Sequence, residues 1–234
     1  MSAQQETALS GSGRRLIVAI DGPAGAGKST VASRIARRFG LLNLETGAMY
    51  RALAFKALTH KLPLDDAHAL ESLTTDTVIR LEPGGDGNRV LLDGQDVTTT
   101  LRQPEITEAA SRVSVHPVIR RWMVEQQRSL GAEGGVVMEG RDIGTAVFPD
   151  AQVKIFLDAT PEARSERRAS QMGAASATQT LEEIRRRDER DRTRAESPLK
   201  PAPDAVVIDS TFLPLEEVLA RIEAVVQRRL DQSL

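Results

Sequence analysis

The chain has 234 residues, 40% of them hydrophobic, and a formal net charge of −2, which suits one globular unit with a buried core. It contains no cysteine, so disulfides, thiolate zinc sites, iron–sulfur clusters and cysteine nucleophiles are excluded. The near-balanced charge argues against a general nucleic-acid binder, and no apolar run approaches the roughly 20 residues of a membrane helix. Only five of the 31 basic residues are lysine. An excess of arginine fits bidentate recognition of phosphate.

Residues 1–13 are small and polar, and we expect them to form a flexible tail. They contain neither the apolar segment of a secretory signal nor the arginines of a mitochondrial import sequence. We therefore expect a cytoplasmic monomer whose partners are small molecules, with no nucleic acid and no membrane among them.

The first elements alternate between strand and helix. Arg15–Ile20 reads RLIVAI, a continuous apolar strand of the kind buried in parallel sheets. After a glycine-rich turn, apolar residues at helical spacing predict a helix that ends at Gly40. Leu41–Leu44 is a second short strand, and a second helix is predicted over about Ala48–Leu58. This order is the opening of a doubly wound α/β fold.

The middle of the chain predicts a small antiparallel unit. Thr77–Leu81 and Arg89–Leu92 are strand candidates, and Pro83–Asn88 between them is a glycine-rich turn. Asp93-Gly94 is a strong two-residue hairpin signal that leads towards a third strand near Val97. The antiparallel unit is therefore inserted between elements of a parallel sheet.

The α/β pattern then resumes. Two amphipathic helices separated by Pro117 are followed by apolar strands at Val136–Met138, Val153–Leu157 and Val206–Ile208. An amphipathic helix that begins near Leu215 closes the chain. The three strands add to the two at the start of the chain and predict one parallel sheet.

Two highly charged helices lie between the last two strands of that pattern. Thr160 and Pro161 form a helix start, with a capping residue followed by proline at the first helical position. Gly173–Gln179 is read as a loop, and Thr180 with Glu183 as the capping box of the second helix. A flexible loop between two charged helices predicts a hinged flap.

The glycine-rich turn matches the phosphate-binding pattern G-x-x-x-x-G-K-[ST] at every fixed position, between a strand and a helix as the pattern requires. Glycines let successive backbone amides converge on phosphate oxygens, and the helix N-terminus adds positive potential. Lys28 is expected at the β- and γ-phosphates and the Ser29 hydroxyl at Mg²⁺. The ATP-binding residues predicted here are Gly22, Pro23, Ala24, Gly25, Ala26, Gly27, Lys28, Ser29 and Thr30.

The chain lacks the features of other large P-loop classes. A GTPase would need N-K-x-D and D-x-x-G, and neither string occurs. The third-strand candidate ends in Glu139 followed by Gly-Arg-Asp rather than the D-E or D-D typical of motor and AAA-type ATPases. The size, the inserted unit and the arginine-rich second half favour a small-molecule kinase.

Five segments form a pattern that is specific in combination. They are IDGPAGAGKST (Ile20–Thr30), TGAMYRALA (Thr46–Ala54), EGRDIGTAVFPDA (Glu139–Ala151), KIFLDA with the following ERR (Lys154–Ala159, Glu166–Arg168) and RRDERDRTRAESPL (Arg186–Leu199). Together they resemble the bacterial cytidylate kinases, a family of P-loop nucleoside monophosphate kinases. The resemblance covers the chain from about Arg15 to its end.

The resemblance implies an α/β fold with a five-stranded parallel sheet flanked by helices, a small antiparallel-sheet acceptor unit and a helical lid. It also implies transfer of the γ-phosphoryl group of ATP to CMP or dCMP with Mg²⁺ as cofactor. On this basis the chain divides into a tail (1–13), a core segment with the P-loop (14–72), an inserted acceptor unit (73–103), a second core segment (104–160), a lid region (161–195) and a closing core segment (196–234).

The resemblance further assigns residues to each substrate. Catalytic roles are implied for Lys28, Arg141 and Arg194, and an ATP contact from the lid for Arg167, with Arg164 and Arg168 beside it at the triphosphate or adenine. The residues implied for CMP are Glu45, Thr46, Tyr50, Arg51, Ser111, Arg120, Arg141, Asp142, Arg187, Asp191 and Arg194. Within this set Ser111, Arg120 and Asp142 surround the base, Arg187 and Asp191 contact the ribose, and Arg51, Arg141 and Arg194 bind the acceptor phosphate.

The residue chemistry agrees with this assignment. Phosphoryl transfer needs charge neutralisation more than acid–base catalysis, so arginines are expected to do the work and His60, His68 and His116 to be structural. A carboxylate such as Asp142 favours the amino group of cytosine over the carbonyl group of uracil.

Two positions depart from the family pattern, and two other functions remain open. Glu45 and Glu139 stand where aspartate is expected, which changes the geometry but keeps the charge. An adenylate or UMP kinase is the alternative within the same class. A non-catalytic module that binds ATP and recruits a partner is the alternative from another class.

Overall fold

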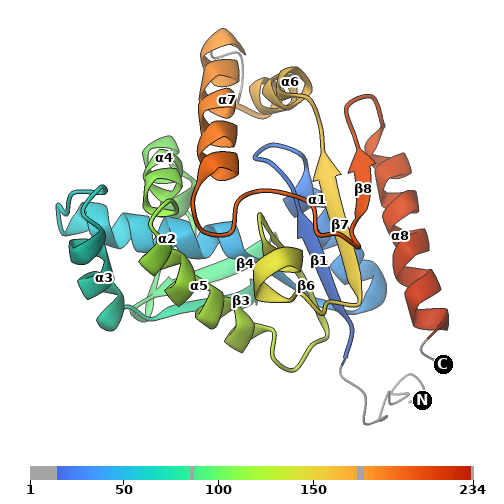
Figure 1. The fold of residues 1–234 in the computed structure, drawn as a ribbon, viewed down its shortest axis with the longest axis horizontal. Helices are drawn as coiled ribbons and strands as arrows, with labels where there is room; N and C mark the ends of the chain where they lie inside the picture. The colour runs from blue at the N-terminus through green and yellow to red at the C-terminus, as the bar shows by residue number, and fades with distance from the viewer. Residues whose placement is uncertain (1–14, 85–86, 173–176, 233–234) are drawn as a thin grey trace, which may run out of the picture.

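A computed structural model describes residues 15–84, 87–172 and 177–232 of the chain (Figure 1). The expected tail at 1–13 lies outside the described residues. At the centre is a parallel five-stranded sheet in the order β2-β6-β1-β7-β8, which confirms the prediction of such a sheet. The strands are β1 (Ile17–Asp21), β2 (Leu42–Glu45), β6 (Val136–Gly140), β7 (Val153–Asp158) and β8 (Val206–Asp209).

Helices and a turn cover the two faces of this sheet. Strand β1 is buried along its whole length, and its side chains alternate between the faces. Val18 and Ile20 join the hydrophobic cluster that contains α1 and α8. Ile17 and Ala19 join a second cluster with the apolar residues of η2. The bounds are α1 (Lys28–Phe39), α8 (Leu215–Asp231) and η2, a π turn (Ile143–Val147).

The first helix ends where the sequence predicts. Gly40 follows α1 in the left-handed conformation, with φ 65°, and its amide donates to the carbonyl oxygen of Ala36. Glycine adopts this conformation without the steric cost that a side chain would bring. The chain then turns directly into β2.

A second hydrophobic core lies beside the sheet, at the left of Figure 1. Its buried residues run from Ala48 to Met123 and come from helices and from a three-stranded antiparallel sheet. The antiparallel sheet within the predicted insertion 73–103 therefore packs with helices that precede and follow it. The elements are α2 (Thr46–Thr59), α3 (Ala67–Thr75), β3 (Ile79–Gly84), β4 (Gly87–Leu92), β5 (Gln95–Asp96), η1 (Thr100–Arg102), α4 (Pro104–Val113) and α5 (Pro117–Leu130).

The antiparallel sheet confirms one predicted turn and corrects another. Asp93 and Gly94 join β4 to β5 with φ angles of 51° and 84°, as a two-residue hairpin turn requires. The predicted turn over Pro83–Asn88 is wrong in its extent, because Pro83 pairs with Asn88 and the strands continue to Gly84 and Gly87.

Asn88 connects this hairpin to the edge of the parallel sheet. Its Oδ1 accepts a hydrogen bond from the amide of Glu45 at 2.8 Å, and its Nδ2 donates to the carbonyl oxygen of Asn43 at 2.7 Å. One side-chain amide therefore satisfies two backbone groups of β2, the strand that leads into the α2 residues of the candidate site.

Two helices, α6 (Pro161–Met172) and α7 (Ala177–Thr193), lie within residues 161–195, the segment for which a lid is predicted. The hydroxyl of Thr160 accepts a hydrogen bond from the amide of Ala163 at 3.3 Å, which confirms the predicted helix start. The expected loop over Gly173–Gln179 is wrong for residues 177–179, which belong to α7, and its residues 173–176 lie outside the described part. Thr180 is inside the helix, so the predicted capping box there is also wrong. Alanine at 177 and glutamine at 179 favour helix and carry the start upstream.

No helix in the described part of the chain is both long and apolar enough to cross a membrane.

Candidate active site

The P-loop connects β1 to α1, and its glycines are required by close packing. A Cβ atom on Gly22, whose φ is 150°, would lie 2.0 Å from the carbonyl oxygen of Leu157. Gly27 has a φ of 95° and precedes the first residue of α1. The Nζ atom of Lys28 donates to the carbonyl oxygen of Pro23 at 2.7 Å. The loop thus leads into the N-terminus of α1, and helix N-termini of this kind favour anions.

A cavity opens over this loop. It is lined by seven of the nine predicted loop residues, while Gly22 and Pro23 lie behind them. Arg167, predicted from the lid, also lines it, and its guanidinium donates to the hydroxyl and the carbonyl oxygen of Ser210. The full lining is Ala24, Gly25, Ala26, Gly27, Lys28, Ser29, Thr30, Val31, Thr107, Leu157, Arg167, Arg168, Arg187, Ser210, Leu215 and Val218.

Three carboxyl groups lie at the carboxyl ends of neighbouring strands. Asp21 is the last residue of β1, Glu45 is the last residue of β2, and Glu139 is the second-to-last residue of β6. Asp21 accepts hydrogen bonds from the amides of Ile143 and Gly144 at 2.8 and 2.7 Å, which fixes the start of η2. Burial nevertheless raises the pKa of Asp21 to about 6.

Lys28 and Glu139 are both buried, and the charge of each affects the pKa of the other. Burial, followed by the charge of Arg141, lowers the pKa of Lys28. Burial, followed by the charge of Glu45, raises the pKa of Glu139, whereas Lys28 and a hydrogen bond with the Ser29 hydroxyl oppose this change. One oxygen of Glu139, Oε1, is buried without a hydrogen-bond partner. An oxygen atom without a hydrogen-bond partner therefore remains available on the carboxyl group that bonds with the hydroxyl of Ser29.

A second cavity lies between α2, α4, the turn after β6 and helix α7. Nine of the eleven predicted acceptor residues line it, and only Glu45 and Arg51 do not. These two form an ion pair with each other, and the Arg51 side chain passes Gly47, which is a lining residue. The lining consists of Thr46, Gly47, Tyr50, Ala110, Ser111, Ser114, Arg120, Gly140, Arg141, Asp142, Arg187, Asp191 and Arg194.

One wall of this acceptor cavity is a buried group around Arg120. Nη2 of Arg120 lies 2.5 Å from Oδ2 of Asp142, and the guanidinium stands over the ring of Tyr50 with 5.7 Å to its centroid. Arg120 also donates to the carbonyl oxygen of Ser114. Burial raises the pKa of Tyr50 to about 12, so its hydroxyl stays protonated. The cavity thus offers a fixed carboxylate beside a fixed guanidinium.

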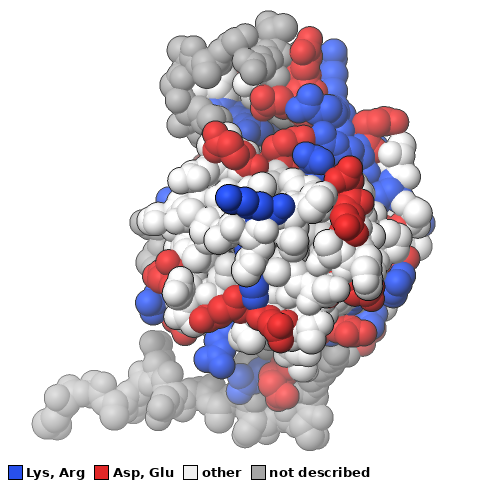
Figure 2. Space-filling view, turned by 90° about the vertical axis from the view of Figure 1, so that its left-hand side faces the viewer, with Lys and Arg blue, Asp and Glu red and all other residues white. Residues whose placement is uncertain are grey.

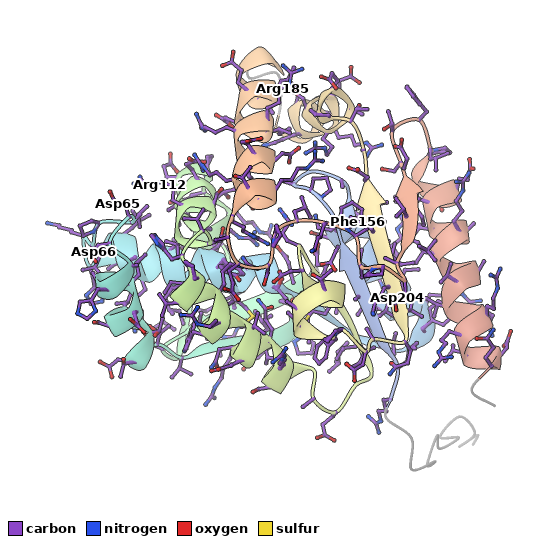
Figure 3. The ribbon with its side chains drawn as sticks, in the orientation of Figure 1. Asp65, Asp66, Arg112, Phe156, Arg185 and Asp204 are labelled. Atoms are coloured by element: carbon purple, nitrogen blue, oxygen red, sulfur yellow. The ribbon has the colours of Figure 1, made fainter. Side chains whose placement is uncertain are left out.

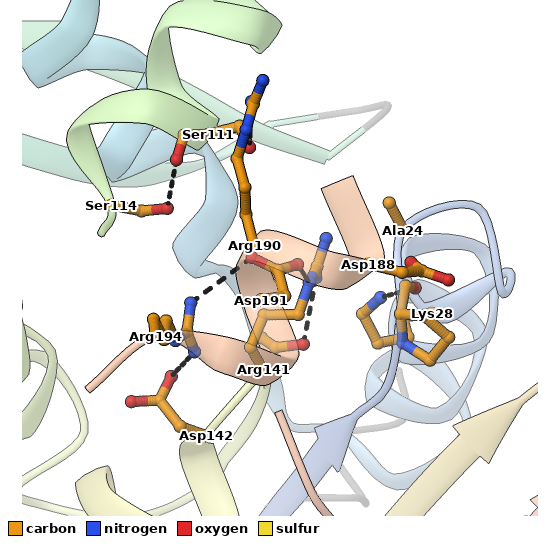
Figure 4. A network of polar contacts seen from close by, with 12 residues as sticks. Ala24, Lys28, Ser111, Ser114, Arg141, Asp142, Asp188, Arg190, Asp191 and Arg194 are labelled. Atoms are coloured by element: carbon orange, nitrogen blue, oxygen red, sulfur yellow. Dashed lines mark hydrogen bonds and ion pairs between the residues drawn. The ribbon is translucent and has the colours of Figure 1, made fainter. Parts of the chain in front are cut away.

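Another wall is a network of arginines around Asp191 (Figure 4). Nε of Arg141 lies 2.9 Å from Oδ2 of Asp191, and Nη1 of Arg194 lies 3.4 Å from Oδ1. Burial alone would raise the pKa of Asp191, but Arg141, Arg187 and Arg194 outweigh it and lower the pKa. Arg187 lines both cavities, and burial together with Arg141 lowers its pKa to about 10. The two cavities therefore meet at Arg187.

Ser111 is held from the opposite helix by a residue that the sequence did not single out. Its hydroxyl accepts a hydrogen bond from Nη1 of Arg190 at 3.1 Å, and Nη2 of Arg190 lies 2.6 Å from Glu108. Arg190 follows Arg187 by three residues and precedes Arg194 by four, so helical spacing places all three on one face. This spacing in the sequence is the signal from which a role for Arg190 could have been predicted.

The sequence comparisons identify the family. The family model described as cytidylate kinase matches residues 18–228. A curated cytidylate kinase of Geobacillus kaustophilus (strain HTA426) is 50% identical over 221 residues, covering 93% of this chain and 99% of that protein. One from Geobacillus sp. (strain WCH70) is 51% identical over 217 residues, covering 91% and 97%, and one from Solibacter usitatus (strain Ellin6076) is 48% identical over 223 residues, covering 93% and 94%.

The chain belongs to the cytidylate kinase family. The family predicted from the five segments, the P-loop kinase fold and the assignment to enzymes of the kinase class are thereby confirmed.

Within this cytidylate kinase chain, one lid arginine does not have its expected place. Arg164 was expected at the triphosphate or adenine, but its side chain is wholly buried and its guanidinium is hydrogen-bonded to Ala159, Ala24 and Asp188. It points beneath the P-loop rather than into the nucleotide cavity. Arg167 and Arg168, in contrast, both line that cavity.

The histidines of this kinase stand outside both cavities. His60 and His68 are exposed, and a ring nitrogen of His116 lies 2.8 Å from the carbonyl oxygen of Leu64. Among the described residues that line the two cavities there is no histidine. The arrangement offers positive charge and hydrogen-bond donors, which are the requirements of phosphoryl transfer.

Proposed function

We propose that this chain transfers the γ-phosphoryl group of ATP to CMP or dCMP and releases ADP with CDP or dCDP. The observation that carries the proposal is the pair of cavities that meet at Arg187, one over the P-loop and one among Arg120, Asp142 and Asp191. Two phosphate-bearing substrates bound in such neighbouring cavities bring donor and acceptor phosphates to one point. Holding the reactants together in this way supplies much of the rate enhancement.

ATP occupies the cavity over the P-loop. The amides from Gly22 to Thr30 hold its phosphates, and Lys28 moves from the carbonyl oxygen of Pro23 to the β- and γ-phosphates. Arg167 contacts the donor nucleotide from the lid. The apolar wall formed by Leu215 and Val218 suits the face of an adenine ring.

CMP occupies the acceptor cavity with its base against Ser111, Arg120 and Asp142. Asp142 accepts a hydrogen bond from the amino group of cytosine, because a carboxylate would face a carbonyl oxygen in uracil. The ion pair with Arg120 fixes the orientation of the Asp142 carboxylate toward the cavity. Thr46 and Tyr50 close the cavity from α2.

The sugar and phosphate of CMP lie toward the arginines. Arg187 and Asp191 contact the ribose, and Arg51, Arg141 and Arg194 bind the acceptor phosphate. Glu45 orients Arg51 through their ion pair. Lys28, Arg141 and Arg194 are the catalytic residues, because they neutralise the charge that develops on the transferred group.

Mg²⁺ is the cofactor that the residues beside Lys28 fit. The unpartnered Oε1 atom of Glu139 and the hydroxyl of Ser29 are oxygen ligands of the kind that Mg²⁺ takes, together with water and phosphate oxygens. Ser29 would hold the ion, with Glu139 behind it. When bound, Mg²⁺ supplies positive charge to the β- and γ-phosphates.

We extend the proposal to the organisation and setting of the enzyme. The P-loop segment 14–72 with 104–160 and 196–234 forms the core, 73–103 belongs to the acceptor unit and 161–195 is the lid. The enzyme is a cytoplasmic monomer without nucleic-acid or membrane partners. For nucleic acid, Figure 2 supports the proposal on one face, where positive and negative side chains are interspersed and form no purely positive patch.

A panel of nucleoside monophosphates tests the function. With ATP and Mg²⁺, we expect product from CMP and dCMP at least about tenfold faster than from UMP or AMP, since one or two hydrogen bonds separate these bases. Faster turnover of AMP or UMP would replace the base assignment with that of an adenylate or UMP kinase. ATP binding without transfer to any of the four would instead support an ATP-regulated binding module.

A further inference from the structure

Arg164 is the most completely buried arginine of the lid, with no exposed surface. Its Nε donates to the carbonyl oxygen of Ala159 at 2.8 Å, and its Nη1 donates to the carbonyl oxygen of Ala24 at 2.9 Å. Nη1 and Nη2 also donate to the two carboxylate oxygens of Asp188 at 3.0 and 2.5 Å. All three nitrogens of the guanidinium are therefore used, and they join three segments of the chain.

The contact with Ala24 reaches the P-loop itself. A Cβ atom on Gly25 would lie 3.3 Å from the Cβ atom of Arg164, so α6 packs directly on the backbone of the loop. A movement of the loop on phosphate binding therefore changes the contacts of Arg164. Ala24 also lines the donor cavity.

The contact with Asp188 reaches the acceptor cavity. Asp188 belongs to α7, between Arg187 and Asp191, which both line that cavity. Its carboxylate is tied to Arg164 by two parallel hydrogen bonds, the geometry that fixes orientation most strictly. Any rotation of α7 that moves Asp188 therefore strains the contacts of Arg164 with the P-loop.

Net stability does not explain such an arrangement. A buried ion pair is on average no more stabilising than apolar side chains of the same size, because both charges lose their hydration. The special property of this ion pair is geometric. A guanidinium that is hydrogen-bonded to three partners allows few relative positions of the three segments that carry them. Arg185 of α7 and Glu162 of α6 show the contrast. They also connect the two helices, with 2.7 Å between the guanidinium and the carboxylate, but both side chains are more than half exposed. Figure 3 labels Arg185 beside the upper turns of α7.

We propose that Arg164 is a positioning residue that couples the two substrate sites, so that ATP at the P-loop orders α7 through Asp188 and raises the affinity for CMP. The inference rests on the proposed function for the identity of the two ligands. Because coupling between two binding sites is reciprocal, CMP raises the affinity for ATP by the same factor. The loop, the guanidinium and α7 form the physical connection.

The experiment measures the dissociation constant of CMP by calorimetry, with and without a non-hydrolysable ATP analogue and Mg²⁺. We expect the analogue to lower that constant by at least about fivefold in the wild type, the lower end of typical coupling. In the double variant Arg164→Met/Asp188→Leu, which leaves no lone buried charge, the ratio should fall to near one, while each ligand alone binds within about threefold of wild type. The control Glu162→Gln/Arg185→Gln should keep the wild-type ratio.

A second variant covers the case in which the double variant does not fold. Arg164→Lys keeps the buried charge but cannot serve Ala24 and both oxygens of Asp188 together, so it too should lose most of the ratio. A wild-type ratio of one, an unchanged ratio in either Arg164 variant, or an equal loss in the control would overturn the coupling. Absence of CMP binding to the wild type would instead contradict the proposed function.

Discussion

Arg141 and Asp191 are 50 residues apart in the chain and meet at 2.9 Å between Nε and Oδ2. The contact joins the turn after β6 to helix α7, so it connects the parallel sheet to one of the two charged helices. The carboxylate holds the guanidinium where an acceptor phosphate is proposed to bind. Asp191 thereby orders a positive site in the absence of phosphate.

Replacement of Asp191 by alanine tests this role. Without the carboxylate, Arg141, Arg187 and Arg194 lose their common partner and repel one another. We expect kcat/KM for CMP to fall by about 10- to 100-fold, the range for a hydrogen bond to a charged group, with a smaller change in KM for ATP. Steady-state kinetics with each substrate varied in turn measures both. Glu189→Ala, an exposed carboxylate on the same helix, is the control, and a similar loss there would contradict the assignment.

Lys28→Ala should abolish most of the transfer and leave the fold intact. The Nζ atom of Lys28 donates to the carbonyl oxygen of Pro23, and burial already lowers the pKa of the lysine. We expect CDP formation to fall by about 100- to 1,000-fold, as when a charge-stabilising donor is removed, with a cooperative thermal transition that shows the fold is retained. Lys200→Ala removes an exposed lysine and should retain full activity. Substantial CDP formation by Lys28→Ala would remove this residue from catalysis.

Ser111→Ala should weaken CMP binding selectively. The hydroxyl lies in the acceptor cavity and accepts from Arg190, 3.1 Å away. Loss of one such hydrogen bond is expected to raise KM for CMP by about three- to tenfold, with KM for ATP unchanged. Ser129→Ala, on the exposed side of α5, provides the baseline. If KM for CMP in Ser111→Ala equals that baseline, the serine does not contact the base.

Asp21 predicts a pH dependence of stability. Burial raises the pKa of Asp21 in the folded protein to about 6, above the ordinary value of an aspartate, so the folded state binds the proton more tightly than the unfolded state. The resulting contribution to stability is present below pH 4 and is lost as the pH rises through 6. Relative to Asp21→Asn, which does not titrate, the wild-type free energy of unfolding should therefore fall by a few kcal/mol at most between pH 4 and 7.

Urea unfolding at several pH values measures this difference. The free energy of unfolding of Asp21→Asn is subtracted from that of the wild type at each pH. The subtraction removes any constant cost of replacing the carboxyl group that accepts from the backbone amides of Ile143 and Gly144. Asp65→Asn, at an exposed site, shows how much of the change is general. A difference between wild type and Asp21→Asn that stays constant over this range would show that burial does not raise this pKa.

The sequence predicted the features that depend on local signals. Gly40, Thr160 and Asp93-Gly94 each act through their own backbone conformation or nearest neighbours, and each element boundary they predict is found. The family is confirmed because its segments keep their order. The missed helix α3 buries only Leu70, so it has almost no periodic pattern, and its one signal is Asp66, whose side chain accepts hydrogen bonds from the amides of His68 and Ala69.

The predictions that were wrong or missing concern side chains whose partners lie far away in the sequence. Arg164 lies three and four residues before Arg167 and Arg168, so helical spacing gives them one face and one predicted role. Burial separates them, because Arg164 lies under α7 and against a loop 140 residues earlier in the chain. Arg190 was overlooked because its partners, Glu108 and Ser111, belong to a helix that only the fold brings close.

The side chain of Asn88 has a consequence for solubility. Strand β2 is at the edge of the parallel sheet, where unpaired amides and carbonyl groups would invite a strand from another molecule. The side chain of Asn88 forms hydrogen bonds with the carbonyl oxygen of Asn43 and the backbone amide of Glu45. A single residue of the acceptor unit thus takes the place of a neighbouring strand at this edge, and intermolecular pairing is blocked there.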